Sequence, residues 1–311
     1  MAGANLTNLA ELIREQFRTP FTDGMQRNTF VYAFFPTKKV EGKQREWEVH
    51  YAGNTGALSY TESGDIPTAG NQSYKKATAP FKLVGVPVQV TGFVDAATKG
   101  GGGFLQALTS ETTEAIKDLK DAINTMQMST SAPGNSGADI TGFPYIISDT
   151  GTYAGLDRST YTWFQSYVLD NSGTDRDLTL SLMQDQYRTL LSPARSSKVT
   201  HIFTSFKHYD DYGNLMADNR RFISPAKMDA GYGQKYDSMP FNGSPVIGVP
   251  GMADGAMYFI NKDFWEYDVL KDFDTEEKSL ATKDAKLFFI SHYAELVCLH
   301  PGKQGKIVDL A

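Results

Sequence analysis

Two stretches of alternating apolar and polar residues, at 47–51 and 84–90, are separated by a long polar connection. Strict alternation puts successive side chains on opposite faces of an extended backbone, so both stretches are predicted to be strands. The connection over residues 53–73 is rich in Gly and Ser, and it far exceeds the about two to five residues of an ordinary hairpin loop. We therefore expect an extended ribbon over residues 45–91 whose packing partners lie elsewhere. The alternative interpretation is a mobile surface hairpin.

Two further segments have the spacing of amphipathic helices. Residues 5–18 place apolar side chains at helical intervals, and Pro20 ends the pattern, which predicts a short terminal helix that docks on something else. Four glycines, at 100–103, precede a longer pattern over 105–126 with charged residues on its other face. That pattern predicts a rod of roughly 35 Å, suitable as a structural spine.

The second half mixes strands and helices without regular alternation, which favours an α+β fold. A break rich in Ser, Pro and Gly at 129–142 is followed by a predicted strand, a helix capped by Thr174, a second strand, and a short helix capped by Ser205. A strand–turn–strand pair and one long strand complete the prediction. The five expected strands cover residues 161–169, 199–204, 246–250 and 256–261 (the pair), and 287–300.

Motifs for chemistry are weak throughout. The four glycines lack the Gly-Lys-Ser/Thr ending of a phosphate loop, the five histidines lack metal-ligand spacing, and residues 208–214 are expected to form a turn rather than a calcium loop. Cys298, the only cysteine, lies in an apolar run where a thiolate is disfavoured. We therefore predict no catalytic, cofactor-binding or metal site.

Composition narrows the class of partners. The net charge of −6 argues against a dedicated nucleic-acid binder, since phosphate contacts need clustered basic residues. A single cysteine excludes an internal disulfide and fits a protein made in a reducing cytoplasm. The longest apolar run is too short to span a bilayer, so no membrane contact is expected.

Several segments of the second half resemble major capsid proteins of tailed double-stranded-DNA bacteriophages. They include Tyr-Thr-Trp-Phe-Gln-Ser-Tyr at 161–167, Asp-Asn-Arg-Arg-Phe at 218–222, and Phe-Asn-Gly-Ser-Pro-Val-Ile-Gly at 241–248. Met-Ala-Asp-Gly-Ala-Met-Tyr-Phe-Ile-Asn at 252–261 and Tyr-Ala-Glu-Leu-Val-Cys at 293–298 follow in the order of that family. Over nearly the whole chain, the order of elements is similar to that of the Hong Kong 97-type capsid fold.

This resemblance implies an α+β chain in four parts. Residues 1–44 would be an N-arm, and 45–92 an extended β-ribbon loop lying across the adjacent subunit. Residues 93–130 and 275–311 would form a peripheral domain with a long spine helix, and 131–274 an axial domain.

The resemblance also implies inter-subunit contacts in the arm and the ribbon. Lys75 and Lys76 lie in the loop that carries cross-links in one branch of the family, but no matching Asn or acid is identified, and solvated lysines holding a neighbour's carboxylates are expected instead. The expected contact residues are Leu9, Leu12, Phe17, Asp65, Ile66, Pro67, Lys75 and Lys76.

The implied function is a structural one without catalysis or cofactor. Copies would form homo-pentamers and homo-hexamers of an icosahedral phage head, assembled in the host bacterial cytoplasm and enclosing double-stranded DNA through weak, non-specific contacts. A portal, a separate scaffolding protein and decoration proteins are the other expected partners. The alternatives are an encapsulin-like compartment shell and an α+β hydrolase with a pocket of perturbed acids.

Overall fold

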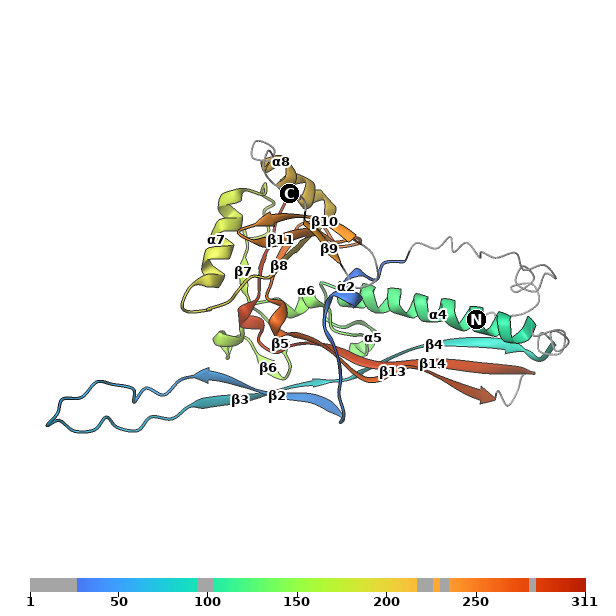
Figure 1. Cartoon of the computed structure of the whole chain (residues 1–311), viewed down its shortest axis with the longest axis horizontal. Helices are drawn as coiled ribbons and strands as arrows, with labels where there is room; N and C mark the ends of the chain where they lie inside the picture. The colour runs from blue at the N-terminus through green and yellow to red at the C-terminus, as the bar shows by residue number, and fades with distance from the viewer. Residues whose placement is uncertain (1–26, 94–102, 217–225, 230–234, 280–283) are drawn as a thin grey trace.

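The computed structural model describes residues 27–93, 103–216, 226–229, 235–279 and 284–311. Figure 1 shows three parts: a long flat layer of strands beneath a helix, a body above one end of that layer, and a ribbon that extends away from both. The expected helix at 5–18 lies outside the described residues. No helix in the described part of the chain is long and apolar enough to cross a membrane.

The flat layer is a four-stranded sheet in the order β1-β13-β14-β4, covered on one face by α4. All its neighbours pair antiparallel except β1, which is parallel to β13. The elements are β1 (Thr37–Lys39), β13 (Trp265–Ser279), β14 (Ala285–Cys298), β4 (Lys82–Thr91) and α4 (Gly103–Gln127).

The body contains a seven-stranded mixed sheet in the order β7-β15-β12-β8-β11-β10-β9, with α7 and α8 beside it. Its strands are β7 (Tyr167–Leu169), β15 (Gly305–Ile307), β12 (Met257–Ile260), β8 (His201–Thr204), β11 (Ser244–Gly248), β10 (Lys235–Phe241) and β9 (Ala226–Asp229). The helices are α7 (Leu180–Leu191) and α8 (Phe206–Leu215).

Short elements connect these layers. They are α2 (Phe30–Phe34), α5 (Gly134–Gly137), α6 (Phe143–Ile146), β5 (Thr152–Tyr153), β6 (Leu156–Asp157), η1 (Thr162–Phe164), η3 (Lys262–Phe264) and η4 (Pro301–Lys303). The ribbon consists of β2 (Gln44–Ala52) and β3 (Ser73–Pro80), an antiparallel pair, with the residues between them.

The expected spine helix and long C-terminal strand are confirmed as α4 and β14. In the part of α4 after residue 110, Ala115, Leu119 and Ile123 recur at four-residue steps and are buried against apolar side chains of β4 that include Val88. A 3.6-residue period places such positions on one side of a helix, which explains why the pattern was visible in the sequence.

An aromatic cluster joins the flat layer to the body. The Phe203 ring of β8 has edge contacts with Phe30 and Phe34 of α2, at centroid distances of 5.5 and 4.6 Å. The Asn124 side chain of α4 accepts hydrogen bonds from the Val31 and Tyr32 amides, which satisfies two otherwise unpaired donors at the start of α2. Residues far apart in sequence are thereby held in one core.

Several expectations about single elements were wrong. The stretch at 84–90 is not an arm of the ribbon, because β4 pairs with β14 and the true partner of β2 is β3. The cap of α7 is Thr179, whose hydroxyl accepts from the Leu182 amide, and not Thr174. Residues 208–214 lie within helix α8 and do not form a turn.

The remaining differences concern which strands are neighbours, where they begin and end, and which sheet they join. The two strands expected to pair around residue 252 are separated by β8, and only the end of the 161–169 segment is a strand. Strand β13 runs across the predicted boundary at residue 274, and β15, expected in the peripheral part, lies in the sheet of the body. Sheet membership therefore does not follow the predicted division.

Candidate assembly surfaces

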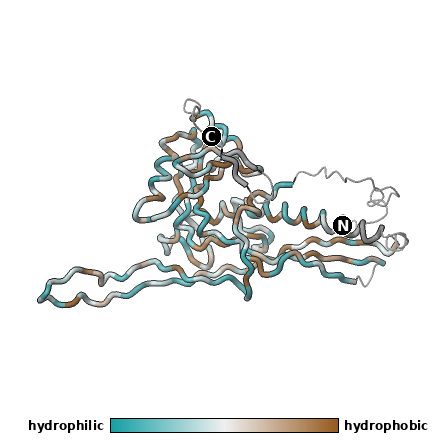
Figure 2. Tube along the Cα trace, in the orientation of Figure 1, coloured by the Kyte–Doolittle hydropathy of each residue, from teal (hydrophilic) through white to brown (hydrophobic). Residues whose placement is uncertain are grey.

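The ribbon tip, residues 53–72, has no strand pairing and exposes large apolar side chains. Leu58 is 69% exposed and Ile66 is 82% exposed. The two sides of the tip approach closely where the chain has glycine: a Cβ on Gly56 would lie 2.5 Å from the Thr68 carbonyl oxygen and 2.9 Å from the Gly70 nitrogen. Short hydrophobic stretches interrupt the hydrophilic colouring of the ribbon (Figure 2).

The base of the ribbon is anchored to the rest of the chain by side chains of β2. Arg45 pairs with Glu266 at 2.9 Å and with the fully buried Asp268 at 3.1 Å. The Trp47 indole donates to the Leu299 carbonyl at 2.9 Å, and the Tyr51 ring is stacked on Trp163 at 5.0 Å. These contacts fix the direction in which the ribbon leaves the body.

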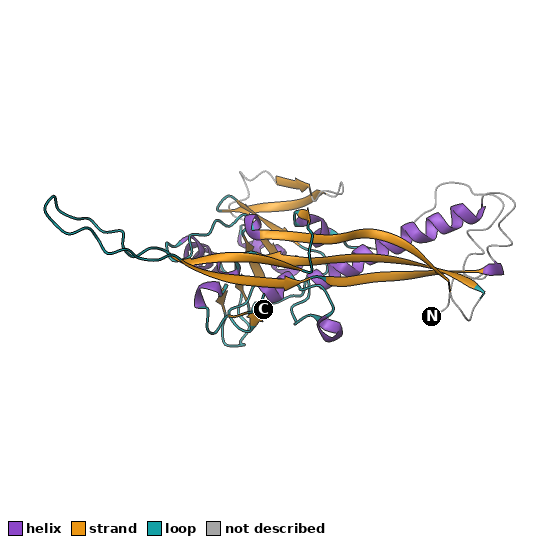
Figure 3. Ribbon diagram, turned by 90° about the horizontal axis from the view of Figure 1, so that it is seen from below, coloured by secondary structure: helices purple, strands orange, loops and turns teal. Residues whose placement is uncertain are grey.

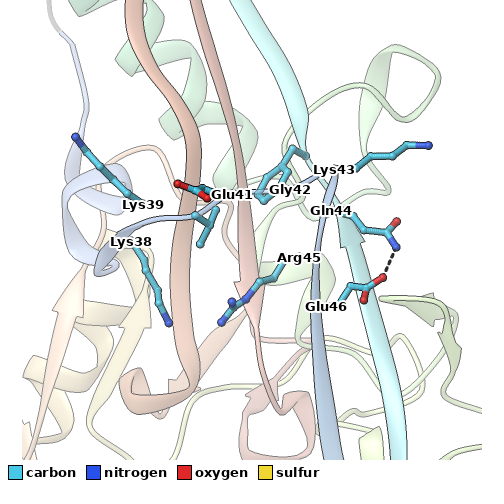
Figure 4. Close-up of a pocket in the computed structure, with 10 residues that line it drawn as sticks. Lys38, Lys39, Glu41, Gly42, Lys43, Gln44, Arg45 and Glu46 are labelled. Carbon is cyan, nitrogen blue, oxygen red and sulfur yellow. Dashed lines mark hydrogen bonds between the residues drawn. The ribbon is translucent and has the colours of Figure 1, made fainter.

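Burial raises the pKa of Asp268 to about 6, while Arg45 opposes that rise. A carboxyl without solvent prefers its neutral form unless a cation is close. Burial therefore outweighs the attraction of Arg45 here, and Arg45 offsets part of the cost of keeping Asp268 ionised. The pair lies beside a shallow concavity of about 720 Å³ lined by residues 38–46 and Phe81. Figure 4 shows Lys39 and Lys43 pointing away from the ribbon base there, while Arg45 lies between the strands.

The open sheet face, opposite α4, is a second exposed apolar surface. Seen from below, the long strands lie in front of α4 (Figure 3). In β4, Leu83, Gly85 and Pro87 are exposed, and Leu83 is 66% accessible. The Phe289 ring occupies the space over Gly85, where a Cβ would lie 2.5 Å from it. The Lys278 ammonium lies 4.8 Å from the centre of that ring, which leaves an apolar strip bordered by charge.

The predicted contact residues divide into three groups. Leu9, Leu12 and Phe17 lie outside the described residues. Asp65 and Ile66 are exposed at the ribbon tip, and the adjacent Pro67 is half-buried.

Lys75 and Lys76 lie on β3, where both have partners within their own chain. The Lys76 ammonium pairs with Glu46 at 2.5 Å, and the Lys75 ammonium lies 5.1 Å from the centre of the Tyr161 ring. Hydrogen bonding to Tyr161 raises the pKa of Lys75, so its ammonium stays charged.

Sequence reasoning missed Arg45 and Asp268. Asp268 alternates with apolar neighbours at 265, 267 and 269, so a buried charge in a strand was the available signal. Its partner lies more than two hundred positions away, and no local pattern connects the two residues.

Four buried titratable groups, three histidines and the cysteine, each keep one protonation state at pH 7. Burial lowers the pKa of His201, His292 and His300 to about 4, so all three are neutral at pH 7. Burial also raises the pKa of the Cys298 thiol, which keeps it protonated. Among the described residues, no three His, Cys, Asp or Glu side chains gather as metal ligands. The exposed apolar surfaces are thus the features that most need explanation.

Comparisons with known proteins give one family and one fold. A family model described as SU10 major capsid protein matches residues 7–311. The structure is similar to a chain of the cyanophage A-1(L) capsid, with a TM-score of 0.74, 16% identity, and coverage of 96% of this chain and 97% of that one. No curated protein sequence matches.

Two other solved structures are similar at lower identity. A chain of Mycobacterium phage Bobi has a TM-score of 0.60, 12% identity and 99% coverage of both chains. The encapsulin complex of Synechococcus elongatus has a TM-score of 0.59 at 10% identity, covering 100% of this chain and 96% of that one. Together these similarities confirm the predicted α+β fold of the Hong Kong 97 type.

Proposed function

Because the chain belongs to the SU10 major capsid protein family, we propose that its copies form the pentamers and hexamers of an icosahedral phage head. The chain is a structural protein of the capsid, as the sequence resemblance had indicated. The observation that supports assembly through the ribbon is the exposure of Leu58 and Ile66 on a segment anchored at one end only. Isolated soluble chains rarely expose such residues on an extended arm without a partner.

The ribbon tip of one copy would lie on the open sheet face of an adjacent copy. Both surfaces are apolar with charged borders: Ile66 beside Asp65 on the tip, and Leu83 and Phe289 near Lys278 on the face. Burying apolar area removes it from water and contributes roughly 25 cal/mol for each Å². Opposite charges at the border would set the register between copies.

The four parts keep the roles that the family suggests, with revised bounds. The N-arm at 1–44 would pack on a neighbour, the extended loop would comprise β2 to β3, and β4 would join α4, β13 and β14 in the peripheral part. The seven-stranded sheet would be the axial part, with its loops at the centre of each capsomer. A portal, a scaffolding protein, decoration proteins and loosely held double-stranded DNA complete the proposed partners, with assembly in the host cytoplasm.

An encapsulin-like shell is the second candidate function. The likeness to the Synechococcus elongatus encapsulin shows a shared fold at 10% identity, and the fold alone does not decide between cargo and genome. The family match over residues 7–311 favours the phage head. We infer no enzymatic activity.

The experiment that tests the ribbon's role removes residues 57–69 and joins Gly56 to Gly70, which already lie close together. We expect normal folding, because the tip contributes no buried side chain, and a loss of closed shells in electron micrographs. The matched control replaces residues 57–69 with Gly and Ser at unchanged length. If side chains of the tip make the contact, the control also fails to close shells; wild-type shells from the deletion variant would refute the proposal.

A further inference from the structure

A cavity of about 180 Å³ lies under the joint where the ribbon enters the flat layer. One wall comes from the end of β3 and the start of β4, and the opposite wall from the β5–β6 hairpin and from residues 133–145. The Thr78 amide donates to the Ala154 carbonyl at 2.9 Å across this joint. Any group bound here would therefore contact both the ribbon and the body.

Glu295 of β14 lines the cavity and is only 2% exposed. Its Oε1 accepts hydrogen bonds from the Thr141 and Leu296 amides, at 2.9 and 3.2 Å. Its Oε2 is buried and has no hydrogen-bond partner within the described structure. An unpaired buried carboxylate oxygen is costly and needs either a proton or a cation. Burial raises the pKa of Glu295 to about 7, against the opposing hydrogen bonds from the amide and side chain of Thr141 and the charge of Lys82, so the group is largely ionised at pH 8.

The other charged and titratable groups around Glu295 do not supply the cation that Oε2 lacks. Lys82 of β4 also lines the cavity, but its ammonium donates to the Gly137 carbonyl. Asp268, opposite Glu295 in the register of β13 and β14, pairs with Arg45. Burial raises the pKa of the Tyr153 phenol, which stays neutral, and its hydroxyl oxygen accepts a hydrogen bond from the Cys298 amide.

The walls near the carboxylate are apolar. Ala79 and Pro80 contribute from the ribbon, and Pro133 and Ala154 from the body. A multivalent metal ion would want several charged oxygen ligands, and one carboxylate does not supply them. An apolar stem that ends in a cation suits both the walls and Oε2.

We propose that this cavity binds a primary alkylammonium group, with Glu295 Oε2 accepting from the ammonium and the Ala79, Pro80 and Pro133 side chains packing on its stem. The ligand is either a free alkylamine or a lysine of a second copy, which present the same chemistry. All the walls belong to one chain, so the site does not depend on the assembly proposed above.

The test uses the purified full-length chain at pH 8, with n-butylammonium chloride compared with tetramethylammonium chloride at equal concentration. Ligand that binds only the folded state raises Tm, and we expect a rise of about 2 °C or more at saturating n-butylammonium. The Glu295→Gln variant should lose the rise, and Glu48→Gln, at an exposed position of β2, should keep it. Equal Tm values for wild type in the two salts would overturn the proposal.

Two further measurements keep the test decisive if Glu295→Gln fails to fold. For wild type, the rise should shrink at pH 5.5, where a proton neutralises Glu295; a rise unchanged by pH overturns the proposal. In Lys82→Met the rise should increase, because a like charge is removed. A rise in Lys82→Met with none in wild type would show that Lys82 itself occupies the site, which also overturns it.

A separate arm distinguishes the two sources of the ligand. If a lysine of a second copy fills the cavity, n-butylammonium should slow shell assembly relative to tetramethylammonium. If the source is a free amine, the assembly rate should be equal in the two salts while the Tm rise persists. Either result supports the site and identifies its ligand.

Discussion

Strand β12 and the ribbon tip both carry large apolar side chains, but those of β12 are buried and those of the tip are exposed. All four residues of β12 are buried, between β15 and β8 in the middle of the body. At the tip, Leu58 and Ile66 are more than two-thirds exposed. The comparison indicates two kinds of apolar residue in one chain: those whose partners are present in the same copy, and those whose partners must come from another molecule.

The base of the ribbon lies between these extremes. Trp47 and Tyr51 contact Leu299 and Trp163, Trp47 also packs on the apolar core, and Arg45 pairs with two acids of β13. The base therefore has enough contacts to be placed by its own chain, whereas the tip does not. Three substitutions, one each in the body, the ribbon base and the ribbon tip, test whether the loss of stability decreases in that order.

The largest loss of stability is expected in the body. Phe203→Ala removes a fully buried ring that contacts Phe30, Phe34 and Phe143, and should lower the free energy of unfolding by about 3–5 kcal/mol. Urea unfolding of the unassembled chain measures it. The matched control is Phe206→Ala at a 53% exposed position, with an expected change within about 0.5 kcal/mol. Equal losses would break the distinction between buried and exposed apolar residues.

An intermediate loss is expected at the ribbon base. Arg45→Met leaves Asp268 buried without its cation and should cost about 1–3 kcal/mol at pH 8. The folded pKa of Asp268 is raised to about 6, above the unfolded value of about 4, so the folded state binds more protons between these values. The stability that this group contributes therefore rises as pH falls from 8 to 5. Removing Arg45 takes away the charge that lowers the folded pKa, so the gap between the folded and unfolded pKa values becomes wider.

The cost of Arg45→Met should accordingly be smaller at pH 5 than at pH 8, as measured by urea unfolding at both values. Arg188→Met is the control, because the Arg188–Asp185 pair is exposed and should contribute less than about 1 kcal/mol. A cost for Arg45→Met that grows on acidification would contradict the role given to Asp268.

The smallest change in stability is expected at the tip. Ile66→Ser alters a side chain that is 82% exposed and should shift the free energy of unfolding by no more than about 0.5 kcal/mol. Its effect should appear in sedimentation velocity as a reduced fraction of assembled shells. Thr61→Ser, on the same tip, should leave both quantities unchanged. If Ile66→Ser lowered the free energy of unfolding and left assembly normal, the tip would behave like the buried core, which contradicts the comparison.

The same distinction explains how far the sequence could predict the fold. Residues 84–90 alternate because one face of β4 is buried under α4, and this visible pattern was mistaken for a ribbon arm. The actual arm, β3, reads Ser-Tyr-Lys-Lys-Ala-Thr-Ala-Pro and buries only Ala77 and Ala79. A periodic apolar pattern indicates side chains that are buried within the same chain. The pattern therefore predicts α4 and β14, but it does not predict β3, which buries few side chains.

The anchoring contacts were beyond prediction for a different reason. The contacts of Arg45 with Asp268 and of Glu295 with Thr141 join residues that are far apart in sequence. Asp268 and Glu295 lie opposite each other on the paired strands β13 and β14, whereas Arg45 comes from β2 and Thr141 from the segment between α5 and α6. A lone Glu within the apolar run at 294–298 was the only local sign of a buried carboxyl. The unusual loop length drew attention to the ribbon, the family resemblance implied contact residues Asp65, Ile66 and Pro67 at its tip, and their contact with another copy stays a prediction.

The position of β15 has a consequence for the time course of folding. Among the described strands, β7 pairs with β15 alone, and β15 also pairs with β12. During synthesis on a ribosome, residues 167–169 emerge long before 305–307 and wait without a strand partner. The body can complete its sheet only after residues 305–307 have emerged, so a nascent chain would not yet present a finished axial surface to its neighbours.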